Sequence, residues 1–338
     1  MAVNVAVVGA TGAVGDLIRT VLAERDFPIR TIKFLASEKS AGKTVTFAGK
    51  TYPVEAIRAE AFAGVQIVLS STPSSVSKEF SPIAAKAGAI VVDNSSAWRM
   101  DPDCPLVVPE VNAEQLHHIK KGIVANPNCV AIPLCVALKP LHDLGGVKRI
   151  VVCTYQSSSG KGAKGLADFE SQLAAFAAGG PVPAPTAHRA QLAGNVITLD
   201  WTLDPNGYTE EENKVINETR KILGDATIGV NPTCVRVPVR VSHSEAVTVE
   251  FHRPVSVAAA KAALATAPGV VLMDETKGEF PQPLHATGTD HTYVGRVRQD
   301  PSCANSLSLW VVADNLRKGA ASNAVQCAEE LVKRGIVK

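Results

Sequence analysis

VNVAVVGATGAVGDLIRTVLAER, at residues 3–25, is the stretch that decides the fold of this chain. Its first six residues are mostly β-branched and predict a buried strand, and the apolar spacing after residue 15 predicts a helix. Between them stand Gly9, Gly12 and Gly15, which let the backbone approach a pyrophosphate at the helix N-terminus. A strand, a glycine turn and a helix in succession predict a dinucleotide site. The alternative is a glycine turn that only packs the helix on the strand.

More strands and one helix are predicted in the first half of the chain, at residues 32–36, 66–70, 77–88 (the helix) and 89–93. Ligands bind at the carboxyl edge of such α/β sheets, where Ser71 and Thr72 follow one strand and Arg99 lies just beyond another. The planar guanidinium of Arg99 suits a phosphate, and a surface ion pair is the equally weighted alternative.

The loop after residues 32–36 bears on the choice of cofactor. Lys39 and Ser40, with Lys43 nearby, are suited to a 2′-phosphate and favour NADP. Glu38 would instead hold the ribose 2′-hydroxyl of NAD. A solvated charged loop without a ligand is the third interpretation.

Bulk composition restricts the class of protein. A chain of 338 residues exceeds one ordinary core, so two domains are expected. The net charge of +2 gives no reason to expect nucleic acid as a partner, and the apolar runs are too short for a membrane span. The N-terminus does not resemble a signal peptide. Seven scattered cysteines without a CxxC motif favour reduced thiols in a cytosol-like compartment.

Asn126-Pro127-Asn128-Cys129 follows a short predicted strand and precedes an apolar run. Pro127 disfavours helix before it and Asn128 is a good N-cap, so Cys129 is expected in the first turn of a helix. A helix N-terminus stabilises a thiolate and supplies N–H donors for an oxyanion. Cys129 is therefore predicted to be a nucleophile, with its own N–H and the Asn128 side chain as oxyanion donors. The other six cysteines are interpreted as inert buried thiols.

The second half has a different pattern. A strand at 149–155 is followed by a polar, glycine-rich loop at 156–162, placed to contact a reacting carbonyl and a nicotinamide. Thr209 and Glu212 have capping-box spacing, which puts residues 210–212 in the first turn of a helix. A strand is predicted over 233–241, and His243 at its end is a candidate base among eight histidines.

The remaining pattern completes an α/β fold with two domains. It predicts helices at 165–178 and 255–265, strands at 292–298 and 306–313, and a C-terminal helix to residue 334. The last helix is expected to pack on the first domain. The predicted organisation is a Rossmann-type dinucleotide-binding domain at 1–130 and 314–338, and an α+β domain at 131–313.

Nine motifs then occur in a specific order: GATGAVG at 9–15, SAGK at 40–43, WRM at 98–100, NPNC at 126–129, YQSSSGKG at 155–162, NGYTEEENK at 206–214, RVPV at 236–239, SHSEA at 242–246 and DNLRKGAA at 314–321. Together they resemble the aspartate-semialdehyde dehydrogenases over essentially the whole chain. The resemblance implies NADPH-dependent reductive dephosphorylation of 4-aspartyl phosphate to aspartate 4-semialdehyde through a cysteine thioester. This step belongs to the biosynthesis of lysine, diaminopimelate, threonine and methionine.

The resemblance also implies the second domain's role and the partners. That domain would be catalytic and dimerising, similar to the C-terminal domain of glyceraldehyde-3-phosphate dehydrogenase. The expected assembly is a cytoplasmic homodimer, or a dimer of dimers. Its ligands would be small molecules, namely the substrate, phosphate and NADP, with no metal.

Residue roles follow from the same resemblance. It implies that Cys129 is the nucleophile, that His243 is the acid–base catalyst and that Gln156 orients the acyl intermediate. It assigns the substrate's α-carboxylate and amine to Arg236 and Glu211, and the phosphate to Arg99 and Lys214. The implied NADP contacts are Thr11, Gly12, Ala13, Val14, Lys39, Ser40, Ser159, Gly160 and Asn315.

Two departures and four rivals accompany this resemblance. Val130-Ala131 stands where the family usually has Ser/Ala-Thr after the nucleophile, and Lys39 stands where the family often has arginine. N-acetyl-glutamyl-phosphate reductase and glyceraldehyde-3-phosphate dehydrogenase share the chemistry but fit NPNC and NGYTEEENK less well. A catalytically silent NADP-binding subunit would not need Cys129 and His243, and a thiol hydrolase would not need the glycine turn.

Overall fold

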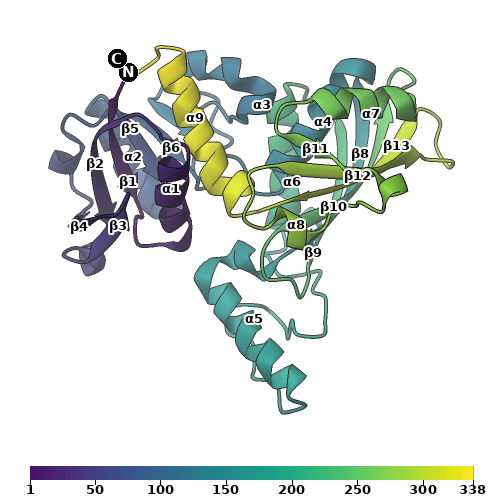
Figure 1. Cartoon of the computed structure of the whole chain (residues 1–338), viewed down its shortest axis with the longest axis horizontal. Coiled ribbons are helices and arrows are strands. Elements are labelled where there is room, and N and C mark those ends of the chain that lie inside the picture. Colours follow the sequence, from purple (N-terminus) through teal and green to yellow (C-terminus); the bar gives the residue numbers. More distant parts are fainter. Residues whose placement is uncertain (338) are drawn as a thin grey trace. The chain divides into compact units, whose positions relative to one another are not determined.

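The structure is a computed structural model that describes residues 1–337, and it divides into two compact units (Figure 1). Unit 1 comprises Met1–Asn128 and the chain from Ala320 onward, and unit 2 comprises Cys129–Gly319. The chain therefore passes from one unit to the other at 128/129 and at 319/320, whereas the boundaries predicted from sequence were 130/131 and 313/314.

Unit 1 is built on a seven-stranded sheet with the order β3-β4-β2-β1-β5-β6-β7. Its strands are β1 (Val3–Val8), β2 (Ile29–Ala36), β3 (Thr44–Phe47), β4 (Lys50–Ala56), β5 (Ile67–Ser70), β6 (Ile90–Asp93) and β7 (Ile123–Ala125). β3 pairs antiparallel with β4, and the other neighbours pair in parallel. β1 is paired on both sides, which explains why its sequence is almost continuously apolar.

The helices of unit 1 are α1 (Ala13–Glu24), α2 (Ser74–Lys86), α3 (Pro109–Asn112) and α9 (Ser322–Lys333), with short 3₁₀ turns η1 (Glu38–Ser40), η2 (Ala59–Phe62) and η3 (Ala113–His118). Ile18 of α1 and Leu331 of α9 belong to the same buried core. An ion pair of 2.7 Å between Arg25 and Glu329 adds to this packing. The C-terminal helix thus completes the unit in which the chain began.

Unit 2 contains a six-stranded mixed sheet with the order β11-β12-β13-β10-β8-β9. Its strands are β8 (Val147–Gln156), β9 (Gly229–Arg236), β10 (His243–Phe251), β11 (Val270–Leu272), β12 (Thr292–Gln299) and β13 (Ser306–Ala313). β10 pairs antiparallel with β8 and β13, whereas β8 and β9 run parallel. The start of β10 therefore lies beside the end of β8.

One face of this sheet is covered by three helices, as Figure 1 shows: α4 (Ala131–Gly145), α6 (Glu210–Leu223) and α7 (Val257–Thr266). Leu138, Val215 and Leu264 from these helices share a core with Val247 and Val249 of β10. The side chains of β10 alternate, so that His243 and Glu245 lie on the same helix-covered face as those valines.

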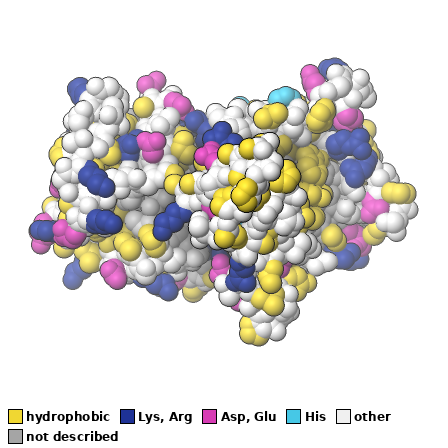
Figure 2. All heavy atoms as spheres, turned by 90° about the horizontal axis from the view of Figure 1, so that it is seen from below, with side chains coloured by type: hydrophobic (Ala, Val, Ile, Leu, Met, Phe, Trp, Pro, Cys, Tyr) yellow, Lys and Arg dark blue, Asp and Glu magenta, His cyan; other side chains and the backbone are white. Residues whose placement is uncertain are grey.

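The rest of unit 2 includes α5 (Gly162–Ala177), α8 (Pro283–Ala286), the 3₁₀ turns η4 (Ser158–Lys161) and η5 (Glu275–Lys277), and the π-helical turn η6 (Arg317–Ala321), which continues into unit 1. α5 projects away from the sheet of unit 2 (Figure 1). The view from that side shows hydrophobic side chains gathered near the middle of the face (Figure 2). Phe176 of α5 and Phe280 are among the exposed large hydrophobic residues.

In the part of the chain that is described, no helix is long and apolar enough to cross a membrane.

Two predicted elements differ from the structure. The helix after the NPNC motif begins at Ala131, with Val130 as its N-cap, so Asn128 is not the cap and Cys129 lies in the turn before the helix. The strand predicted over 233–241 instead spans Gly229–Arg236. The chain leaves the sheet after Arg236, and Ser242 has a φ of 76°, which interrupts any extended run before His243.

Candidate active site

The glycine turn in unit 1 is shaped by two close backbone approaches. A Cβ at Gly9 would lie 2.1 Å from the Ser71 carbonyl oxygen, and one at Gly15 would lie 2.2 Å from the Gly9 oxygen. Packing alone therefore requires glycine at both positions. At Gly12 a Cβ would meet only the Gly9 oxygen, at 3.4 Å, so internal packing does not require glycine there. Since Gly12 is the N-cap of α1, its small size leaves the helix N-terminus open to an anion, as a dinucleotide phosphate requires.

Two other predicted cofactor loops lie in the same unit. Ser71 and Thr72 follow β5 and pack against Gly9, since the Thr72 methyl would lie 3.3 Å from a Cβ there. Lys39 and Ser40 occupy η1, directly after β2, with Lys39 exposed. The Glu38 carboxylate is 3.0 Å from the Arg58 guanidinium. This exposed ion pair adds little to the stability of the fold. It does, however, engage the carboxylate of Glu38, which is the group that would hold the ribose 2′-hydroxyl of NAD.

Arg99 is a largely buried residue of unit 1, only 9% exposed. Its Nε donates to the Asn126 carbonyl oxygen at 3.0 Å and its Nη2 to the Asn94 carbonyl oxygen at 2.8 Å. Arg99 thus holds together the loops that follow β6 and β7, and it is not the surface residue that the alternative interpretation required. Asn126 extends this loop contact by donating from Nδ2 to Asn94 Oδ1 at 2.8 Å.

Cys129 opens unit 2 in the turn that leads into α4, and it is partly exposed. A Cβ at Gly319 would lie 3.0 Å from the Cys129 Cβ, so the chain segment after β13 passes directly against the cysteine. Burial raises the pKa of the Cys135 and Cys234 thiols, as expected for inert cysteines. Cys153 and Cys303 are only partly buried, so the prediction of six buried thiols is wrong for these two.

His243 is the first residue of β10 and is almost fully buried. The Ser157 backbone N–H donates to its Nδ1 at 3.0 Å, and the Ser157 hydroxyl lies at the same distance. Burial, and next the nearby Arg236 charge, lower the pKa of His243 well below its ordinary value. The ring is therefore neutral. Because an N–H can only donate, Nδ1 accepts and the ring hydrogen resides on Nε2, which has no hydrogen-bond partner among residues 1–337.

Asn315 links the loop beside His243 to the segment that reaches Cys129. Its Oδ1 accepts from the Ser157 hydroxyl at 3.1 Å, the Ser159 hydroxyl at 3.0 Å and the Ser242 N–H at 2.9 Å. Two residues earlier, Ala313 lies opposite His243 in the sheet. Four residues later, Gly319 lies against Cys129. Residues 313–319 therefore run from the histidine to the cysteine.

Arg236 and His243 meet at Gly160. A Cβ on Gly160 would lie 2.9 Å from Arg236 Nη1 and 3.3 Å from His243 Nε2. Arg236 is the last residue of β9, beside Gln156 at the end of β8, and only 1% of it is exposed. Its Nη1 donates to the Ser157 carbonyl oxygen at 2.6 Å. A side chain at residue 160 would therefore press on both Arg236 and His243.

Gln156, Glu211 and Lys214 form a second group at the same end of the sheet. Gln156 Nε2 donates to Glu211 Oε1 at 3.3 Å, and Lys214 Nζ lies 3.4 Å from Glu211 Oε2. The predicted capping box at Thr209 and Glu212 is confirmed, with both reciprocal hydrogen bonds present. That cap begins α6 at Glu210 and so fixes Glu211 in the first turn, beside the strand ends.

The predicted residues are divided between the two units. Unit 2 holds Cys129, Gln156, Ser159, Gly160, Glu211, Lys214, Arg236, His243 and Asn315, and unit 1 holds the glycine turn, Lys39, Ser40, Ser71, Thr72, Arg99 and Asn128. Sequence reasoning missed Ser157, which orients His243, and Asp200, which contacts Arg236. It also missed Glu245, whose carboxyl is buried without a partner in the described chain and whose pKa is raised by burial. No local motif marks Asp200 or Glu245.

Comparisons with known proteins agree with this division of the chain. A family model described as "Semialdehyde dehydrogenase, NAD binding domain" matches residues 4–119. A second, "Semialdehyde dehydrogenase, dimerisation domain", matches residues 138–318. Fold and site thus define a semialdehyde dehydrogenase that uses a nicotinamide dinucleotide.

Individual relatives narrow the family. The chain is 49% identical to an aspartate-semialdehyde dehydrogenase of Aquifex aeolicus over 340 aligned positions, which cover 100% of both chains. It is 46% identical to the crystal structure of aspartate semialdehyde dehydrogenase II from Vibrio cholerae, with a TM-score of 0.95 and coverage of 98% and 99% of the two chains. A structure of that Vibrio protein complexed with ASA matches equally well. The chain belongs to the aspartate-semialdehyde dehydrogenase family.

Proposed function

We propose that this protein reduces 4-aspartyl phosphate to aspartate 4-semialdehyde and phosphate, with NADPH as reductant, in the aspartate pathway of amino-acid biosynthesis. Family membership over the full chain supports the reaction. The observation that carries the chemistry is the meeting of a neutral His243 Nε2–H and the Arg236 guanidinium at Gly160.

Cys129 is the nucleophile in this proposal. Its thiolate attacks the acyl carbon, phosphate leaves, and a thioester remains, which divides one difficult reduction into two easier steps. The N-terminus of α4 favours the thiolate and the oxyanion through its dipole, and Asn128 stands next to the cysteine as a further donor. Arg99 and Lys214 are assigned to the phosphate.

His243 exchanges the protons of the reaction. In the orientation set by Ser157, its Nε2–H donates a hydrogen bond to the oxygen on which charge develops. Once the ring has taken the thiol proton of Cys129 and become imidazolium, it returns that proton to the oxygen formed when hydride reduces the thioester. Taking the thiol proton from Cys129 requires the other neutral tautomer or a ring turned away from Ser157. Gln156 orients the acyl group, and Glu211 and Arg236 hold the amine and the α-carboxylate of the substrate.

The cofactor is assigned to unit 1 and to the loop at Ser159 and Gly160. Gly9, Thr11, Gly12, Ala13, Val14 and Gly15 offer the pyrophosphate the open N-terminus of α1. Lys39 and Ser40 favour NADP over NAD, because Glu38 is engaged with Arg58. When bound, NADPH supplies the hydride that converts the thioester into the aldehyde.

The proposed assembly is a cytoplasmic homodimer formed through unit 2. The face of its sheet opposite the helices carries Cys153, Thr248 and Trp310, and it forms a pocket with Phe280. The Tyr155 and Trp310 rings contact each other on this face, with centroids 5.2 Å apart. A partly apolar face of this kind suits a second copy of the chain.

The test is phosphate-dependent reduction of NADP with aspartate semialdehyde, which follows the reaction in reverse. Activity is expected with phosphate and is expected to fall sharply without it. N-acetylglutamate semialdehyde and glyceraldehyde 3-phosphate serve as competing substrates. Preference for either of these over aspartate semialdehyde would contradict the proposal.

A further inference from the structure

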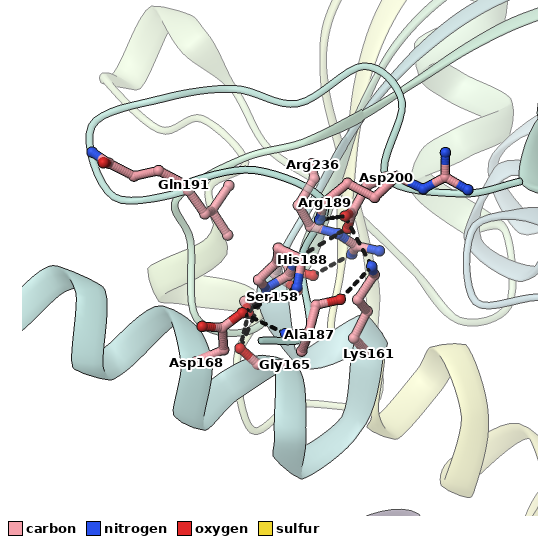
Figure 3. A network of polar contacts seen from close by, with 12 residues as sticks. Ser158, Lys161, Gly165, Asp168, Ala187, His188, Arg189, Gln191, Asp200 and Arg236 are labelled. Atoms are coloured by element: carbon pink, nitrogen blue, oxygen red, sulfur yellow. Dashed lines mark hydrogen bonds and ion pairs between the residues drawn. The ribbon is translucent and has the colours of Figure 1, made fainter. Parts of the chain in front are cut away.

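A buried carboxylate outside all the predicted site residues lies behind Arg236. Asp200 stands in the long connection between α5 and α6, and its side chain is fully buried. Its Oδ2 accepts from Arg236 Nε at 2.9 Å and from His188 Nδ1 at 3.0 Å. Its Oδ1 accepts from Lys161 Nζ at 2.8 Å and from the Arg189 N–H at 3.0 Å. Figure 3 shows these donors converging on the one carboxylate.

We propose that Asp200 is a positioning residue that holds the Arg236 guanidinium in the orientation needed to bind the substrate's α-carboxylate. This inference rests on the proposed function, in which Arg236 binds that carboxylate. Asp200 does not itself touch the substrate, and it acts through Arg236.

The contacts of Arg236 show how its orientation is set. Its Nε points to Asp200, and one hydrogen of Nη1 points to the Ser157 carbonyl oxygen. Its face lies over the Trp201 ring, 4.5 Å from the centroid. Asp200 and Trp201 are consecutive, so one dipeptide supplies both the anion and the ring. The guanidinium carries five N–H groups, so Nη2 and the second hydrogen of Nη1 remain for a two-point contact with a carboxylate.

The charges around Asp200 explain why an anion is needed there. Arg236 and Lys161 are two cations that flank the same buried point. Although burial alone would raise the pKa of Asp200, hydrogen bonds from His188, Lys161, the Arg189 N–H and Arg236 lower it, so the group is ionised. Without that charge, Arg236 would be buried unpaired, and a guanidinium is then free to turn toward other acceptors.

The same carboxylate also fixes the loop that completes the site. Lys161 and the neighbouring Ser158 belong to η4, and His188 Nε2 lies 2.8 Å from the Ser158 hydroxyl. Asp200 is therefore connected to the loop that carries Ser157 and Gly160, both of which contact Arg236.

Ser158 contacts His188, and His188 contacts Asp200, which is the sequence of contacts in a hydrolytic triad. The three residues nevertheless do not form such a triad. Ser158 is fully buried, and its hydroxyl donates to the Gly165 carbonyl oxygen at 2.6 Å. A serine without access to a substrate cannot act as a nucleophile. The three residues therefore serve to fix the loop.

Asp168 provides a matched control. It is also a buried aspartate, and its Oδ2 accepts from the backbone N–H groups of Thr186, Ala187 and His188 at 2.8–3.0 Å. It supports the same connection as Asp200, as Figure 3 shows, but all its hydrogen bonds are to groups other than Arg236. A purely structural loss should therefore affect Asp168→Asn and Asp200→Asn alike.

The experiment measures the KM values for aspartate semialdehyde, phosphate and NADP in the reverse assay, for the wild type, Asp200→Asn and Asp168→Asn. We expect Asp200→Asn to raise the KM for aspartate semialdehyde by about tenfold or more, as for a misplaced binding group. Its kcat should fall by less than about threefold, since the contact exists before and during the reaction. The KM values for phosphate and NADP should change by less than about twofold, and Asp168→Asn should show no such selectivity.

Asp200→Glu is the second variant, because it keeps the charge but moves it by one methylene. It is expected to fold and to show the same selective rise in the KM for aspartate semialdehyde. Equal changes in all three KM values, or an unchanged KM for aspartate semialdehyde in both Asp200 variants, would overturn the inference. An inactive wild type would instead refute the proposed function, so the two failures are distinguishable.

Discussion

The two units present their ligand groups in different ways. In unit 1 the expected cofactor site is made largely of backbone, at a turn whose shape depends on the absence of side chains at Gly9 and Gly15. In unit 2 the proposed catalytic and substrate-binding groups are side chains at strand ends, and each is held by a buried polar partner: His243 by Ser157, Arg236 by Asp200 and Gln156 by Glu211. A backbone site is encoded locally, whereas a side-chain site depends on which strands lie side by side.

The comparison predicts that the chemistry and the cofactor site can be separated by mutation. Cys129→Ala is expected to reduce phosphate-dependent activity by about four orders of magnitude or more, as for the loss of other nucleophiles. Binding of NADP should be unchanged, because Cys129 is not among the residues assigned to the cofactor. Enzyme assays and a fluorescence titration of the cofactor measure the two properties.

Cys303→Ala is the control for this change, since Cys303 is also only partly buried. It should retain full activity. An active Cys129→Ala protein would remove the thioester from the mechanism.

The glycines of unit 1 should divide into packing and binding positions. Gly9→Ala is expected to lower the free energy of unfolding by about 3 kcal/mol, because a Cβ would lie 2.1 Å from a carbonyl oxygen and φ is +81°. Gly12→Ala should cost less than about 1 kcal/mol but weaken NADP binding. Urea unfolding and cofactor titration measure both effects. If Gly12→Ala bound NADP as tightly as the wild type, the turn would only be packing the helix.

Gly160→Ala tests the point at which Arg236 and His243 meet in unit 2. A Cβ there would push against Arg236 Nη1 and the His243 ring, so kcat/KM should fall by about thirtyfold, or roughly 2 kcal/mol. Gly180→Ala is the matched control, because its Cβ would meet nothing closer than 3.8 Å. Steady-state kinetics measure the effect, and equal activity of the two variants would show that the meeting of Arg236 and His243 at residue 160 has no part in the reaction.

Lys39→Glu probes the edge of the cofactor site. The lysine charge is expected to favour the 2′-phosphate, and reversal should lower the ratio of kcat/KM for NADP over NAD by about tenfold, roughly 1.4 kcal/mol. An unchanged ratio would exclude Lys39 from the phosphate contact.

The smallest expected effect is on the pH dependence of stability. Burial raises the pKa of Glu245 well above its ordinary 4.5, so the folded protein retains a proton that the unfolded chain releases. Stability from this group is complete below pH 4.5 and declines as the pH rises toward the folded pKa. Glu245→Gln should remove that decline. Urea midpoints at several pH values measure it, and parallel curves for both proteins would show that Glu245 is ionised.

The difference between the units also explains what the sequence could predict. The glycine turn, the capping box at Thr209 and the strand at Ser306–Ala313 depend on neighbouring residues, and each lies where the pattern placed it. The start of α4 was misplaced because the N-cap preference of Asn128 is a local tendency that the tertiary fold overrides.

Contacts between distant residues were beyond sequence reasoning. Asp200 and Arg236 are 36 positions apart, and no sequence motif contains both residues. The buried state of Arg99 depends on the loops after two separate strands, so its position alone could not distinguish a surface ion pair from a hydrogen-bonded interior residue.

The two ends of unit 2 lie next to each other. Cys129 is its first residue and Gly319 its last, and a Cβ on Gly319 would lie 3.0 Å from that of Cys129. A segment whose two ends meet can be inserted into a loop of another domain without forcing that loop apart. Unit 2 meets this geometric condition, and the proposed nucleophile, Cys129, lies at the point where the chain enters it.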